Sequence, residues 1–125
     1  MSLSQRKTKD EIEAMYANSH LKQAPSDKSL ISLVRGFSDR VKNGRTIDDV
    51  LNHTMEELGE LATEVKITNG KSYKQPGKDG IVGESIDIIL CALDMIYIDN
   101  PSVTEEDILR IALTKCEKWE RTNVG

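Results

Sequence analysis

The chain has 125 residues, the size of about one domain, and 38% of them are hydrophobic although only 4% are aromatic. Its formal net charge of −4 argues against nonspecific binding to nucleic acid or to an anionic membrane, because neither surface attracts an acidic protein. No apolar run reaches the ~20 residues of a membrane span. The amino terminus lacks the apolar core of a signal peptide, so we expect a cytoplasmic protein.

The first 28 residues are polar and contain Pro25, with a short possible helix from Thr8 to Lys22. We expect residues 1–28 to form an arm or a peripheral helix. From Ser29 onward, apolar residues recur every three or four positions, which predicts a helix that ends at Asn43-Gly44. The predicted domain therefore covers residues 29–125.

Two long helices are predicted in the middle of the chain. Thr46, followed three residues later by an acidic residue, is typical of a helix start, and this helix should run to about Lys66. Residues 68–80 contain glycines, a proline and lysines, which predict a loop. A further helix is expected over residues 81–98.

Asn100-Pro101 should end that helix, and Ser102 or Thr104 should cap a last one, which reaches about Thr122. No β-period is present, so the sequence predicts an all-α fold, a bundle of four principal helices. Such short helices with few aromatic residues leave apolar faces uncovered. We therefore expect a homodimer or a dimer of dimers.

Both cysteines and the single tryptophan fall within predicted helices. Cys91 and Cys116 are predicted to be small core residues, because they form neither a CxxC pair nor a Cys/His cluster. Trp119 is predicted to anchor the last helix by apolar contact, and stacking on a nucleotide base is the alternative.

Carboxylates gather on one side of each long predicted helix. At 100° per residue, Glu57, Glu60 and Glu64 share a narrow arc with His53, which we expect to pair with Glu57. Glu84, Asp87 and Asp94 share an arc on a segment that is otherwise almost entirely apolar. Burial of an unpaired ionised carboxylate is costly, so the second arc requires partners. Two alternatives to this interpretation remain open. The first arc could simply face solvent, and lysines of the loop could pair with the carboxylates.

If the two helices pack antiparallel, Glu57 and Glu60 can face Glu84 and Asp87. Four carboxylates form an all-oxygen site, which suits Mg²⁺ or Mn²⁺ better than zinc. Mg²⁺ usually completes its coordination with water and substrate phosphates, so the pattern favours a phosphorylated substrate.

Two short motifs carry a resemblance to a known family. Glu56-Glu57-Leu58-Gly59-Glu60 matches EExxE and Glu84-Ser85-Ile86-Asp87 matches ExxD, with 23 residues between Glu60 and Glu84. In this order, on two predicted helices, they resemble the signature of the MazG-like all-α nucleoside triphosphate pyrophosphohydrolases. The resemblance covers about residues 30–121.

The resemblance implies Mg²⁺-dependent hydrolysis of nucleoside triphosphates between the α- and β-phosphates, which gives a nucleoside monophosphate and pyrophosphate. It implies that Glu57, Glu60, Glu84 and Asp87 bind the metal, and that Glu56 orients water or supports the ligands. The catalytic residues would be Glu56, Glu57 and Glu60. Residues expected to contact the substrate are Lys74, Lys78, Asp94, Lys118 and Arg121.

Two other functions remain compatible with the sequence. One is a dUTPase-like or phosphoribosyl-ATP-specific enzyme of the same broad fold. The other is a non-catalytic helical binding or assembly module whose carboxylates pair with lysines.

Overall fold

A computed structural model describes residues 7–16, 29–41, 44–71 and 80–123. All regular structure in these ranges is helical, as predicted. The helices are α1 (Lys9–Tyr16), α2 (Leu30–Val41), α3 (Ile47–Thr68), α4 (Gly80–Asp99) and α5 (Glu105–Asn123). None of the helices in the described ranges combines the length and apolar character needed to cross a bilayer.

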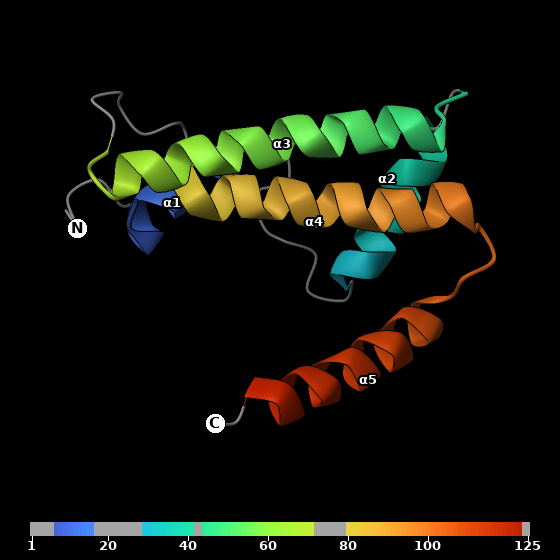
Figure 1. Cartoon of the computed structure of the whole chain (residues 1–125). Coiled ribbons are helices and arrows are strands. Elements are labelled where there is room, and N and C mark those ends of the chain that lie inside the picture. The colour runs from blue at the N-terminus through green and yellow to red at the C-terminus, as the bar shows by residue number, and fades with distance from the viewer. Residues whose placement is uncertain (1–6, 17–28, 42–43, 72–79, 124–125) are drawn as a thin grey trace.

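The two longest helices, α3 and α4, run antiparallel and side by side along most of their length (Figure 1). Helix α2 packs against α4 and lies behind the pair in this view. The most buried apolar side chains come from these three helices: Val34, Val50, Ile67, Cys91, Leu93 and Tyr97. The core therefore lies between α2, α3 and α4.

Three helices begin with the same local sequence pattern, a threonine followed three residues later by an acidic residue. At α3 the Asp49 backbone N–H donates to Thr46 Oγ1 over 3.2 Å, and the Thr46 N–H donates to Asp49 Oδ2 over 2.9 Å. Thr104 and Asp107 exchange equivalent bonds at α5, so Thr104, not Ser102, caps this helix. Thr8 and Glu11 do the same at α1. Each of these reciprocal pairs is a capping box, which satisfies backbone N–H groups that the first helical turn leaves without partners.

The loop between the long helices is described only at its ends. Helix α3 continues to Thr68, two residues beyond the predicted end, and Gly70 follows with a φ of +71°. Residues 72–79, which include Lys74 and Lys78, lie outside the described ranges. Gly80 opens α4 with a φ of +61°, and a Cβ there would lie 3.1 Å from Lys7 Cγ. Both the backbone angle and the lack of space favour glycine at this position.

Arg35 on α2 fixes the connection between α4 and α5. Its guanidinium donates to the carbonyl oxygens of Pro101 over 2.7 Å and Val103 over 3.2 Å. The same group lies over the buried Tyr97 ring, 4.5 Å from its centroid. Ser32 adds a hydrogen bond to Glu105 at the start of α5. The amino-terminal end of α5 is thereby attached to α2.

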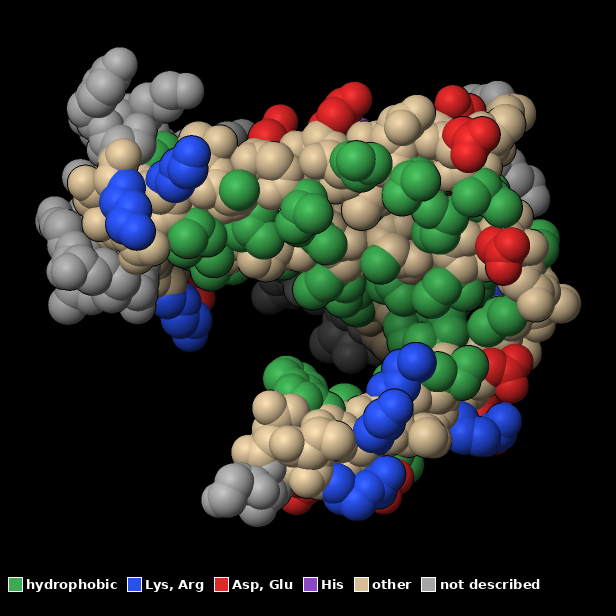
Figure 2. Space-filling view, viewed as in Figure 1, with side chains coloured by type: hydrophobic (Ala, Val, Ile, Leu, Met, Phe, Trp, Pro, Cys, Tyr) green, Lys and Arg blue, Asp and Glu red, His purple; other side chains and the backbone are tan. Residues whose placement is uncertain are grey.

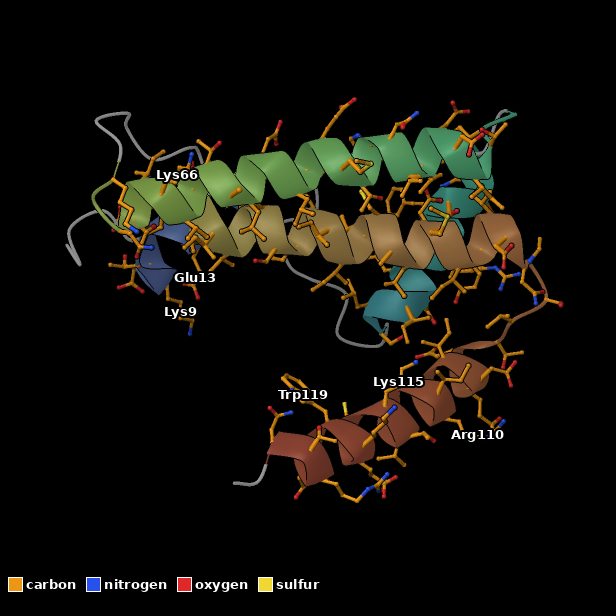
Figure 3. The ribbon with its side chains drawn as sticks, in the orientation of Figure 1. Lys9, Glu13, Lys66, Arg110, Lys115 and Trp119 are labelled. Carbon is orange, nitrogen blue, oxygen red and sulfur yellow. The ribbon has the colours of Figure 1, made fainter. Side chains whose placement is uncertain are left out.

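The rest of α5 diverges from α3 and α4 (Figure 1), and none of its residues is buried. Trp119 is 69% exposed, and its ring projects into open space (Figure 3). Cys116 is also exposed, whereas Cys91 is buried as predicted. The core position of Cys116 and the anchoring role of Trp119 were therefore wrong for the chain by itself. Both residues lie on the apolar side of α5, but no other described element covers that side.

Candidate functional site: an acidic cluster beside a pocket

The antiparallel packing of α3 and α4 brings together carboxylates that are far apart in sequence. Glu57 and Glu60 project from adjacent turns of α3, and Glu84 projects from the first half of α4. One carboxylate oxygen from each of the three lies within 4.8 Å of the others. We call Glu57, Glu60 and Glu84 the acidic cluster.

Two members of the acidic cluster, Glu57 and Glu84, are half-buried, and each has one inaccessible oxygen without a hydrogen-bond partner. The Glu57 side chain is 13% exposed. Its Oε2 and the Oε2 of Glu84 are both inaccessible and accept no hydrogen bond. Burial raises the pKa of Glu84 to about 7, and the nearby charges of Glu60, Asp87 and Glu57 act in the same direction. Burial also raises the pKa of Glu57, again with contributions from Glu60 and Asp87.

Within the described ranges, His53 is the only basic side chain paired with the acidic cluster. Its Nε2 lies 3.5 Å from Glu57 Oε1, as the shared arc on α3 predicted. Its Nδ1 lies 3.9 Å from Glu56, whose side chain is 74% exposed. The structure thus leaves Glu56 outside the acidic cluster. Asp87 is also outside the group of three oxygens, although its charge acts on both Glu57 and Glu84.

A pocket with a cavity volume of about 420 Å³ adjoins this cluster. Apolar side chains of α2 and α4 form much of its wall: Leu33, Val34, Phe37, Val41 and Leu90. Glu57 and Asp87 line the pocket as well, so the carboxylates border an apolar space. This volume falls within the ~300–1,000 Å³ typical of small-molecule sites, which also combine apolar walls with a few polar groups.

Asp94 lines the same pocket but has partners within the protein. Arg45 donates to both of its carboxylate oxygens, with an Nη2 to Oδ1 distance of 3.1 Å. Ser38 Oγ donates to Asp94 Oδ1 over 2.6 Å. Burial alone would raise the pKa of Asp94, but the hydrogen bonds from Arg45 and Ser38 hold it below its usual value.

Arg45 and Ser38 were not among the residues singled out from the sequence. Arg45 precedes the cap of α3, and its partner follows 49 positions later. No periodicity connects residues so far apart. Only the high density of apolar residues around Asp94 indicated that this carboxylate needed a cation.

Two predicted substrate contacts, Lys118 and Arg121, lie on the exposed part of α5. Open space separates this part of the helix from α3 and α4 in Figure 2. The structure therefore does not bring these side chains against the acidic cluster.

No protein-family model, curated protein or solved structure matches the chain significantly. The donor set itself suits a hard divalent cation. Carboxylate oxygens are the ligands that Mg²⁺ prefers, and two buried oxygens of the acidic cluster have no other partner. A cation there would also relieve the mutual repulsion that helps to raise the pKa of Glu84.

Proposed function

We propose that the protein is a Mg²⁺-dependent nucleoside triphosphate pyrophosphohydrolase of the MazG-like kind. In this reaction the oxygen of a water molecule bonds to one phosphorus of the anhydride between the α- and β-phosphates, the bridging P–O bond breaks, and a nucleoside monophosphate and pyrophosphate are released. The observation that carries this proposal is the acidic cluster with its two unpaired buried oxygens, which borders a pocket of ligand size. The EExxE and ExxD motifs supply the reaction class.

Glu57, Glu60 and Glu84 would hold the cation in this proposal, with Asp87 completing the set. Mg²⁺, when bound, supplies the positive charge that phosphate oxygens require as the leaving pyrophosphate develops negative charge. Glu56 remains the proposed water-orienting residue on the strength of the EExxE motif, and its carboxylate lies 3.9 Å from His53 Nδ1 at the edge of the site. Mn²⁺ has similar ligand preferences and should substitute for Mg²⁺.

The nucleoside would occupy the pocket between α2, α3 and α4. Its apolar walls can cover a base, and its carboxylate border places the triphosphate beside the acidic cluster. The ion pair between Arg45 and Asp94 would fix the connection before α3 against α4, which keeps one wall of the pocket in position. Arg45 also contributes positive charge to a lining that contains the carboxylates of Glu57, Asp87 and Asp94.

The decisive experiment is a substrate panel. Ribo- and deoxynucleoside triphosphates, including dUTP, and phosphoribosyl-ATP should be incubated with the protein and Mg²⁺, and the products separated by ion-exchange chromatography. We expect pyrophosphate and a nucleoside monophosphate from at least one nucleoside triphosphate, with turnover abolished by EDTA and restored by Mg²⁺ or Mn²⁺.

The pattern across the panel distinguishes the remaining functions. Turnover restricted to dUTP or phosphoribosyl-ATP would assign a specialised enzyme of the same broad fold. Release of orthophosphate alone, or no turnover of any compound, would refute the proposal. If no compound is turned over, a melting temperature unaffected by Mg²⁺ would favour the non-catalytic module.

A further inference from the structure

The pocket beside the acidic cluster has a second polar end, whose hydrogen-bonding groups the proposed reaction does not use. Ser38 on α2 lines this end together with Asp94 on α4 and Arg45, which precedes α3. Asp87, beside the acidic cluster, lies about two turns before Asp94 on α4. At 1.5 Å per residue this separation corresponds to about 10 Å along the helix. The pocket thus connects the acidic cluster with a separate group of polar side chains.

The wall between the two polar regions is apolar. Leu90 and Cys91 lie between Asp87 and Asp94 along α4, and both line the pocket. The separation of the polar regions is close to the length of a nucleotide from its α-phosphate to the far edge of its base. A nucleotide whose phosphates lie beside the acidic cluster would therefore bring the far edge of its base to Ser38.

Ser38 is the most enclosed of the three polar residues at this end. It is 6% exposed, whereas the side chains of Asp94 and Arg45 are 17% and 29% exposed. A serine hydroxyl can donate one hydrogen bond and accept two. The hydrogen of Ser38 is committed within the protein, because Oγ donates to Asp94 Oδ1 over 2.6 Å. Arg45 donates to both oxygens of Asp94 and so holds this carboxylate in place.

This chain of hydrogen bonds leaves Ser38 able only to accept. Both lone pairs of its Oγ are available, since none of the described residues donates to it. An enclosed acceptor favours a ligand that brings an N–H group, because a ligand that brings another acceptor leaves both groups without a partner. Adenine and cytosine carry an exocyclic amino group on the edge remote from the sugar. Hypoxanthine, guanine and uracil carry a carbonyl oxygen at the corresponding position.

We propose that Ser38 selects nucleotides whose base carries this exocyclic amino group, adenine or cytosine, over their keto counterparts. Asp94 is a positioning residue, since it acts through the hydroxyl hydrogen of Ser38. The inference rests on the proposed function only for the placement of a nucleotide in the pocket.

Chemical-shift titration of isotope-labelled protein with nucleoside monophosphates and Mg²⁺ tests the proposal without requiring turnover. AMP and IMP form one matched pair, and CMP and UMP the other, because the members of each pair differ only on the edge that would meet Ser38. AMP and CMP should bind at least about 10-fold more tightly than IMP and UMP. Equal affinities within both pairs, tighter binding of IMP and UMP, or no binding of any of the four would overturn the proposal.

Substitutions test whether Ser38 itself is responsible for the preference. Ser38→Ala removes the acceptor and should reduce the preference within each pair to less than about 3-fold. Asp94→Asn weakens the bond that fixes the hydroxyl hydrogen and should reduce the preference in the same direction. Ser32→Ala is the matched control, the same change on α2 at a residue that does not line the pocket, and should keep the wild-type preference.

The wild-type comparison still decides the question if Ser38→Ala fails to fold. An unchanged preference in folded Ser38→Ala would overturn the assignment to this residue, and an unchanged preference in Asp94→Asn would overturn the positioning role of Asp94.

The failure of this inference is distinguishable from the failure of the proposed function. A preference for AMP and CMP in binding, without turnover of any triphosphate, would refute the hydrolase and support the selection by Ser38. Turnover with equal kcat/KM for ATP and ITP would support the hydrolase and overturn the selection.

Discussion

The carboxylates at the two ends of α4 have opposite surroundings and opposite pKa shifts. Near the amino-terminal end, burial and neighbouring acids raise the pKa of Glu84 to about 7, and one of its oxygens is buried without a partner. Near the other end, Arg45 and Ser38 bind Asp94 and lower its pKa. Both residues belong to the same acidic arc, and both lie beside the pocket or the cluster that borders it.

The difference separates a structural carboxylate from one available to a ligand. Asp94 is neutralised by the protein itself, so its negative charge contributes to folding. Glu84 faces other acids, so its negative charge opposes folding unless a proton or a cation compensates for it. Asp94 shows how this protein neutralises a carboxylate with its own side chains. Glu84, on the same helix, faces other acids instead, and this difference is the strongest support for a ligand at the acidic cluster.

The largest expected effect concerns turnover. Glu60→Gln removes a charge from the acidic cluster while keeping its size, and should lower pyrophosphate release by at least about 100-fold through loss of the cation. Glu106→Gln, an exposed substitution on α5, is the control and should behave as wild type. Wild-type turnover in Glu60→Gln would remove this residue from the site.

The next effect concerns stability without metal. Asp94→Asn should lower the free energy of unfolding by about 1–3 kcal/mol at pH 7, because Arg45 loses its charged partner. Glu84→Gln should leave it unchanged or raise it, since it removes an uncompensated charge. Urea unfolding followed by circular dichroism measures both. Equal destabilisation by the two substitutions would contradict the distinction between them.

The contribution of Asp94 should also depend on pH. Its folded-state pKa is lowered from an ordinary value of 3.8. The stabilisation is therefore complete above that value and is lost as pH falls below it. The difference between wild type and Asp94→Asn should accordingly shrink in strongly acidic buffer.

A further effect is the pH dependence caused by Glu84. Its pKa rises from 4.5 in the unfolded chain to about 7 in the fold, so its protonated form stabilises the protein fully below pH 4.5. That stabilisation is lost as pH rises through 7. Between pH 5 and 8 the melting temperature of metal-free protein should fall by a few degrees, roughly. Mg²⁺ should reverse the fall at pH 8.

The matched control for this pH dependence is Glu84→Gln, which should show a flatter profile over the same range. Subtraction of the two profiles isolates the contribution of Glu84. Parallel profiles for wild type and Glu84→Gln would mean that Glu84 does not titrate in this range.

Local sequence determined what could be predicted about the fold. The boxes formed by Thr46 with Asp49 and Thr104 with Asp107 act within one helical turn, so the sequence could place these helix starts within a few residues. The meeting of Glu57 and Glu60 with Glu84 followed from periodicity and a short connection. The helical periodicity and the length of the connection can both be read from residues that lie close together in the sequence.

The errors have a common physical cause. Periodicity shows which side of a helix is apolar, but not which element covers that side. Cys116 and Trp119 lie on the apolar side of α5, and the described chain leaves them exposed. The partnership of Arg45 with Asp94 was missed for a related reason, because it depends on how α4 lies against the connection between α2 and α3.

The hydrogen bonds from Arg35 to Pro101 and Val103, which fix the connection between α4 and α5, also set the direction of α5. Beyond this connection, α5 is a rigid rod of 19 residues, about 28 Å long, so a 10° change at the joint would displace the far end by about 5 Å. The positions of Lys118 and Arg121 are therefore governed by a side chain more than 80 positions earlier in the sequence. A substitution of Arg35 would act on the carboxy-terminal end of the chain as a change of direction, without altering any residue there.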